Sequence, residues 1–178
     1  MLTLEGLRVL IAEDETIIRL DLRQMLEQHG AFVCGEARDG LEAIELARTT
    51  SPDVGIFDVK MPNLDGVEAA RRIYAERPLP IVMLTAYSDS STVDRAIGAG
   101  VFSYVSKPFG PKDVLPAIRA AVARHGDLLQ ARREVGRRLE PLEVEVRSSS
   151  GQVWPLRVRR TPDGAIDIDA IPPAIPPE

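Results

Sequence analysis

The sequence has few aromatic residues, a single cysteine and no long hydrophobic stretch. Of its 178 residues 4% are aromatic, and Cys34 has no second cysteine with which to form an internal disulfide. No stretch approaches the ~20 apolar residues that a membrane-spanning helix needs, and the first ten residues lack the pattern of a signal peptide. These absences predict a cytoplasmic protein that makes no membrane contact.

The chain also has no large excess of charge, since its net charge is −5. A negative net charge disfavours a nucleic-acid partner for the chain as a whole. Residues 119–160 differ from the rest, with ten arginines against five acidic residues. A solvated helix face and tail explain this local excess more simply than an RNA or DNA contact does.

Hydrophobic patterns alternate along the first 124 residues. Short apolar runs predict strands at 7–12, 31–37, 54–58, 81–85 and 102–106, and helical periodicity predicts helices at 15–28, 39–48, 65–76, 91–99 and 112–124. Such alternation is typical of an α/β fold, a doubly wound, five-stranded parallel sheet with five helices. We expect the flavodoxin-like strand order 2-1-3-4-5, in which ligands bind beyond the carboxyl ends of the strands.

The pattern changes after residue 124, the end of the predicted domain 1–124. Residues 125–140 read as a helical extension or linker, and residues 141–178 as a Pro-rich tail. Alternating residues and the T-P-D-G turn favour a β-hairpin in this tail, whereas Pro155 disfavours a strand. The sequence therefore leaves two alternatives for the tail, a short hairpin and disorder.

Polar side chains stand where four of the predicted strands end. Glu13 and Asp14 follow the first strand, Asp58 ends the third, Thr85 ends the fourth and Lys107 follows the fifth. Each alone is more often a cap, a turn hydroxyl or a surface lysine, but joint placement at one edge of the sheet is hard to obtain by chance. Three neighbouring acids repel one another unless a cation lies among them, and a hard divalent ion such as Mg²⁺ suits oxygen ligands. A lysine and a hydroxyl suit phosphoryl oxygens, and a carboxylate can act as a phosphoryl-accepting nucleophile.

Four segments carry a specific resemblance. Residues 7 to about 125 resemble the receiver domain of two-component response regulators in A-E-D (12–14), F-D-V-K-M-P-N-L-D-G (57–66), L-T-A (84–86) and Y-V-S-K-P-F (104–109). The resemblance implies that Asp58 accepts a phosphoryl group from a sensor histidine kinase. It also implies Mg²⁺ bound by Glu13, Asp14, Asp58 and the backbone carbonyl of Lys60.

The same resemblance implies roles for six further residues. Thr85 and Lys107 would bind the phosphoryl oxygens, and Tyr104 would change rotamer with Thr85. Pro62 and Gly66 would shape the loop after Asp58, and the Lys107–Pro108 peptide would be cis. Phosphorylation would switch the surface formed by the fourth helix, the fifth strand and the fifth helix, and the protein would catalyse only its own phosphorylation and dephosphorylation.

The sequence leaves two alternatives for the function. The finer resemblance, in residues 8–22, 58–62 and 113–124, is to regulators with an RNA-binding antiterminator (ANTAR) domain, but residues 141–178 lack the helical period of that domain. Here it would be degenerate or frame-shifted, which leaves RNA binding open, as homodimer formation is. An aspartyl-nucleophile phosphatase is the less favoured alternative, because those enzymes place a second acid two residues after the nucleophile, where this chain has Lys60. No G-x-G-x-x-G follows the first strand, which excludes a dinucleotide site of that type.

Overall fold

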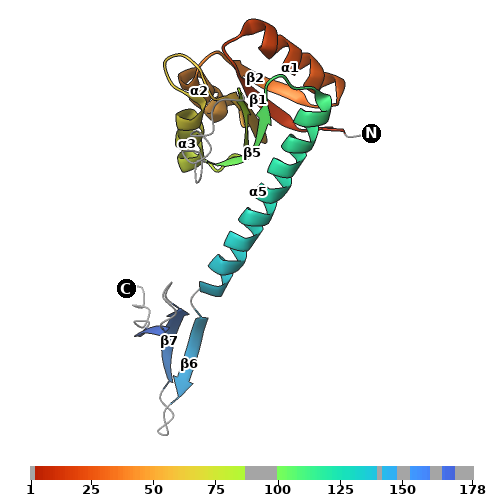
Figure 1. The fold of residues 1–178 in the computed structure, drawn as a ribbon. Coiled ribbons are helices and arrows are strands. Elements are labelled where there is room, and N and C mark those ends of the chain that lie inside the picture. The colour runs from red at the N-terminus through yellow and green to blue at the C-terminus, as the bar shows by residue number, and fades with distance from the viewer. Residues whose placement is uncertain (1–2, 87–99, 140–141, 148–152, 161–165, 171–178) are drawn as a thin grey trace, which may run out of the picture. The chain divides into compact units, whose positions relative to one another are not determined.

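The computed structural model describes residues 3–86, 100–139, 142–147, 153–160 and 166–170 (Figure 1). Contacts within the chain divide it into two units, Met1–Asp127 and Leu128–Glu178. The last helix of the first unit, α5 (Pro111–Leu139), continues past this boundary without interruption. The predicted segment 112–124 and the predicted helical extension thus form one helix.

The first unit contains a five-stranded parallel sheet. Its strands are β1 (Arg8–Ala12), β2 (Phe32–Ala37), β3 (Val54–Asp58), β4 (Ile81–Thr85) and β5 (Val101–Ser106). They pair in the order β2-β1-β3-β4-β5, which confirms the doubly wound fold and the strand order predicted from the sequence. β3 lies at the centre of the sheet and all five of its residues are buried, which explains why it reads as a continuous apolar run.

Within the described residues, three helices alternate with these strands before α5. They are α1 (Thr16–Gln28), α2 (Gly40–Thr50) and α3 (Gly66–Glu76), each within two residues of its predicted bounds. Side chains cap two of them, because Asp39 and Asp65 accept hydrogen bonds from the third residue beyond each cap, as good N-caps do. The helix predicted at 91–99 lies outside the described residues.

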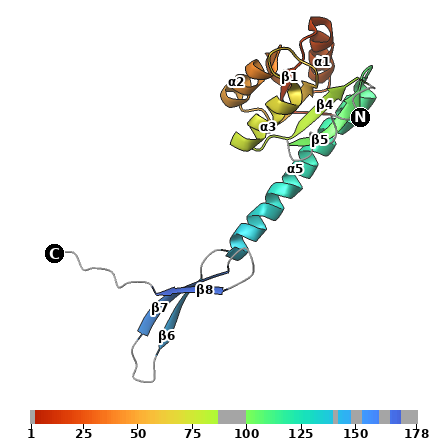
Figure 2. The ribbon, with the colours of Figure 1, turned by 60° about the vertical axis from the view of Figure 1, so that its left-hand side comes forward.

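Two hydrophobic cores lie on opposite faces of the sheet. Alternate strand residues face opposite sides, so Val9 and Ile11 join the core beneath α1 and α5, while Leu10 and Ala12 join the core beneath α2 and α3. Figures 1 and 2 show the two pairs of helices on either side of the sheet. With both faces covered, the carboxyl-terminal edge of the strands is left as the place for polar chemistry.

The second unit contains an antiparallel sheet in the order β6-β7-β8. Its strands are β6 (Leu142–Arg147), β7 (Val153–Arg160) and β8 (Ile166–Ala170). Pro155, which disfavoured a strand, pairs in register with Glu145 of β6, whereas β8 pairs only with Leu156–Arg160. Proline is tolerated there because, within the described residues, its position in β7 has a neighbouring strand on one side only.

None of the helices in the described part of the chain combines the length and the apolar composition needed to cross a membrane.

Candidate functional site

Three acidic side chains converge where β1 and β3 end. Glu13 and Asp14 directly follow β1, and Asp58 is the last residue of β3, the strand beside it. One carboxylate oxygen from each of Glu13, Asp14 and Asp58 lies within 4.8 Å of the others. Glu13 and Asp58 are buried and Asp14 is exposed, so the cluster is closed on one side and faces solvent on the other. The sequence predicted this cluster.

Lys107 reaches the cluster from the end of β5, which is an edge strand of the sheet. It follows β5, and its Nζ lies 2.8 Å from Glu13 Oε2 and 2.8 Å from Asp58 Oδ1. The peptide bond between Lys107 and Pro108 is cis, as expected, and the amide of Lys107 donates to the carbonyl of Thr85. A single ammonium group is therefore shared between two buried carboxylates.

Burial and charge shift the pKa values of these groups. Burial raises the pKa of Glu13 and that of Asp58, because loss of water disfavours a carboxylate more than the Lys107 contacts favour it. Burial also lowers the pKa of Lys107, but its hydrogen bonds with Asp58 and Glu13 outweigh burial and the pKa is raised overall. For both carboxylates, burial thus outweighs the favourable contact with Lys107.

The loop after β3 fixes the main chain around Asp58. The amide of Lys60 donates to Asp58 Oδ2 at 3.0 Å, and the amide of Gly66 donates to the carbonyl of Val59 at 3.0 Å. A Cβ on Gly66 would lie 1.9 Å from the carbonyl oxygen of Asp58, so only glycine fits there. In the same loop, the main-chain carbonyl of Pro62 accepts a hydrogen bond from the amide of Leu64.

Thr85 and Tyr104 lie beside the cluster on neighbouring strands. Asp58 pairs with Leu84 in register, so Thr85 is one residue further along β4 than the partner of Asp58. Tyr104 pairs with Met83, and the alternation of the strands places Tyr104 and Thr85 on the same face of the sheet. The hydroxyl of Thr85 donates to the carbonyl of Ala86 at 3.0 Å, and burial raises the pKa of Tyr104.

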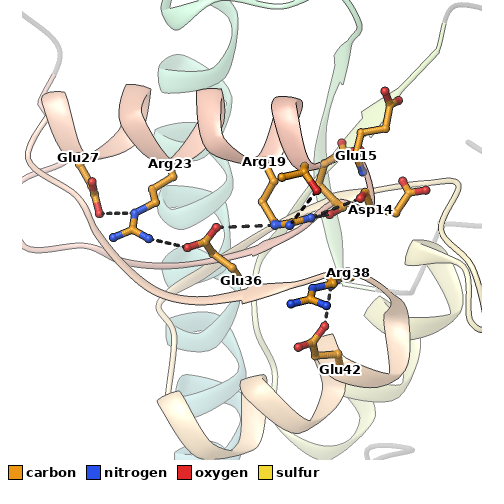
Figure 3. A network of polar contacts seen from close by, with 10 residues as sticks. Asp14, Glu15, Arg19, Arg23, Glu27, Glu36, Arg38 and Glu42 are labelled. Carbon is orange, nitrogen blue, oxygen red and sulfur yellow. Dashed lines mark hydrogen bonds and ion pairs between the residues drawn. The ribbon is translucent and has the colours of Figure 1, made fainter.

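Arg19 is a residue of the site that the sequence analysis missed. It belongs to α1, is 9% exposed, and its Nη1 donates to the carbonyl oxygens of Glu13 at 2.6 Å and Asp14 at 3.4 Å (Figure 3). One signal could have found it. A cation in the first turn of a helix opposes the helix dipole, so Arg19 needs another reason to be there.

The cluster fits a magnesium ion on the chemistry of its donors. Glu13, Asp14 and Asp58 offer only oxygen atoms, which are the ligands that Mg²⁺ prefers. The exposed side at Asp14 leaves room for the water molecules that Mg²⁺ retains. Burial raises the pKa values of Glu13 and Asp58, and a bound cation would favour their ionised forms.

The raised pKa values of the two buried carboxylates predict a pH dependence of stability. We expect the contribution of Glu13 and Asp58 to the stability of the metal-free protein to fall as the pH rises through their folded-state pKa values. Both values are raised above their ordinary 4.5 and 3.8, so the stabilisation is fully present below those ordinary values and is lost above the raised ones. Urea unfolding in EDTA over a pH series measures this loss. It should be smaller in Asp58→Asn, and an equal loss in that variant would contradict the assignment.

Both the sequence and the structure of this chain resemble those of known receiver domains. Residues 9–119 match the model of the response regulator receiver domain. Transcriptional regulatory protein PdtaR of Mycobacterium tuberculosis is 49% identical over 137 residues, which is 77% of this chain and 67% of PdtaR. Protein-glutamate methylesterase/protein-glutamine glutaminase 4 of Myxococcus xanthus is 40% identical over 134 residues, 74% of this chain but only 37% of that protein.

Two solved structures with a similar fold are also described as receiver domains. The signal receiver domain of a modulated diguanylate cyclase from Desulfovibrio desulfuricans superposes with a TM-score of 0.64 at 33% identity, covering 68% of this chain and 98% of that one. A response regulator receiver domain protein from Clostridium thermocellum has a TM-score of 0.63 at 30% identity, with the same coverage of both chains. The family match over residues 9–119 includes Glu13, Asp14 and Asp58.

Proposed function

Because this chain belongs to the response regulator receiver domain family, we propose that it is a two-component response regulator in which Asp58 accepts a phosphoryl group. One observation carries the proposal. Asp58 lies at the end of the central strand, with Lys107 at 2.8 Å and the carboxylates of Glu13 and Asp14 within 4.8 Å. The proposed nucleophile thus contacts the ammonium group of Lys107 and lies close to the other proposed metal ligands. A sensor histidine kinase is the proposed donor.

In the proposed reaction a carboxylate oxygen of Asp58 attacks the phosphorus atom of the donor. A bond forms between that oxygen and phosphorus, and the bond to the leaving group breaks with its electron pair remaining on that group. The product is an acyl phosphate on Asp58. Lys107, which in the present structure contacts Asp58 and Glu13, is placed to contact the incoming phosphoryl oxygens as a point charge.

Magnesium belongs to this proposal as the cofactor. Glu13, Asp14 and Asp58 would hold it together with the carbonyl oxygen of Lys60, and when bound it supplies positive charge that offsets the charge of the transferring phosphoryl group. Thr85, one residue beyond the strand partner of Asp58, would donate its hydroxyl to a phosphoryl oxygen. Tyr104, on the same sheet face, would then respond to the position of Thr85.

The proposed output is a switch between two surface conformations, biased by the charge on Asp58. β5 carries Tyr104 and is followed directly by Lys107, and α5 comes next in the chain, so we propose that these two elements form the switch surface with the segment 91–99. Regulation of transcription is the output class that the name of the relative PdtaR supports. The strands β6 to β8 differ from the three-helix bundle of an antiterminator, so we do not assign RNA binding.

Incubation of the protein with acetyl phosphate and Mg²⁺ tests the proposal. We expect the intact mass to increase by one phosphate, and we expect no increase when EDTA replaces Mg²⁺, because the acidic cluster then lacks its counter-charge. Treatment with hydroxylamine, which attacks the acyl carbon and expels phosphate, should remove the added phosphate and leave a hydroxamate at Asp58. No mass increase in the presence of Mg²⁺, or an increase that resists hydroxylamine, would contradict phosphorylation on a carboxylate.

A further inference from the structure

Arg19 makes contacts that the reaction at Asp58 does not itself require. It is the fourth residue of α1, buried to 9% exposure, and its guanidinium donates to main-chain oxygens of the two residues that follow β1. A buried cation in the first turn of a helix is unfavourable with respect to the helix dipole. The contacts of Arg19 must therefore provide a compensating advantage.

The main chain after β1 needs such support. Successive residues of an extended strand point to opposite faces, yet the adjacent Glu13 and Asp14 both direct a carboxylate oxygen to the same cluster with Asp58. The chain must therefore turn between them. The amide of Glu13 still pairs with the carbonyl of Ala37 in β2, while the carbonyl of Glu13 accepts from Arg19 at 2.6 Å. Arg19 thus bonds the main chain at the point where it leaves the sheet.

Arg19 is itself held in place. Its Nε lies 3.7 Å from Glu36 Oε2 in β2, and Glu36 also pairs with Arg23 Nη1 at 2.8 Å. Figure 3 shows this chain of contacts, from Glu27 and Arg23 through Glu36 to Arg19 and the Asp14 segment. Arg23 lies on the same helix as Arg19 and also contacts Glu36. Among the described residues, its guanidinium contacts are with the side chains of Glu27 and Glu36, and not with the main chain after β1.

We propose that Arg19 is a positioning residue for a divalent cation: its guanidinium holds the main chain of Glu13 and Asp14 in the shape that lets both carboxylates bind the ion. The proposal rests on the proposed function of the acidic cluster as a magnesium site. It predicts a change in Mg²⁺ affinity on removal of Arg19 that is opposite in sign to the change predicted from charge alone. A positive charge next to a cation site weakens binding, so charge alone predicts that removal of Arg19 tightens Mg²⁺ binding, whereas positioning predicts that removal weakens it.

Titration calorimetry with Mg²⁺ alone separates these cases on the full chain. We expect Arg19→Gln to raise the dissociation constant about 10- to 100-fold, the usual effect of removing a group that orients metal ligands. The conservative Arg19→Lys retains the charge but has one donor group in place of a planar fork, so its loss should be smaller. Arg23→Gln is the matched control and should bind as the wild type does. The same order should appear in the Mg²⁺-dependent rise of the unfolding midpoint in urea.

The outcomes distinguish this inference from the proposed function. Binding in Arg19→Gln that equals or exceeds that of the wild type would overturn the positioning role, as would an equal loss in Arg23→Gln. If Arg19→Gln does not fold, wild-type affinity in Arg19→Lys has the same meaning. A wild-type protein that binds no Mg²⁺ would instead contradict the proposed metal site, on which the inference depends.

Discussion

Asp58→Asn is expected to take up no phosphate from acetyl phosphate and Mg²⁺, under conditions in which the wild type gains one. An amide cannot act as the oxygen nucleophile, and the other acids of the cluster, Glu13 and Asp14, lie at the end of a different strand. Intact-mass spectrometry gives the readout. Because Asp21 is an exposed acid on α1, Asp21→Asn is a suitable control and should be phosphorylated as the wild type is. Phosphate uptake by Asp58→Asn at the wild-type level would show that another residue is the acceptor.

The same variant should be more stable than the wild type near neutral pH in EDTA. Burial raises the pKa of Asp58, with the charge of Asp14 adding to the effect, so the ionised carboxylate is unfavourable in the folded protein. Asparagine removes that charge while keeping a similar shape. Loss of phosphorylation together with a gain in stability would separate a chemical defect from a folding defect. A less stable Asp58→Asn would show that the Lys107 contact outweighs the burial.

Gly66→Ala is expected to destabilise the first unit by at least about 3 kcal/mol, the upper end of the usual cost of overpacking. The new Cβ would lie 1.9 Å from the main-chain oxygen of Asp58, which cannot move aside as a flexible side chain could. The displacement would also affect the bond from the amide of Gly66 to the carbonyl of Val59. Urea unfolding followed by circular dichroism measures the change in free energy of unfolding.

Gly126→Ala is the matched control for this substitution. Gly126 lies inside α5, and among the described residues no neighbouring atom lies within 4 Å of the position that its Cβ would take. Alanine is a better helix former than glycine by about 0.8–1.0 kcal/mol, so this variant should be slightly more stable than the wild type. If both glycine variants lost stability equally, contact with the Asp58 carbonyl would not be the cause.

The sheet and the acidic cluster could be predicted because both follow from order along the chain. Parallel strands separated by helices place the carboxyl ends of β1, β3 and β5 at one edge, so Glu13, Asp58 and Lys107 must meet there. No pairwise contact had to be known in advance. Gly66 could be associated with the loop after Asp58, but the close approach of two main-chain segments that requires glycine is visible only in three dimensions.

Arg19 and the second sheet could not be predicted in the same way. The bonds of Arg19 are to main-chain oxygens, which every residue has, so no partner residue type marks them in the sequence. For β7 the difficulty was Pro155, whose effect depends on whether a strand lies on both sides of it. That is a property of register with β6 and β8, and the sequence of β7 does not contain it.

Main-chain hydrogen bonds around Asp58 hold the end of β3 firmly in place. Val59 donates to Leu84, Gly66 donates to Val59, and Lys60 donates to the carboxylate itself, so the main chain is tied to β4 and to the start of α3. At the end of β4, by contrast, the hydroxyl of Thr85 bonds to the adjacent carbonyl of Ala86, and one rotation about its side-chain bond would exchange that acceptor for another. A change in the charge on Asp58 would then alter the side chain of Thr85 on the neighbouring strand β4, while the main chain of β3 stays in place.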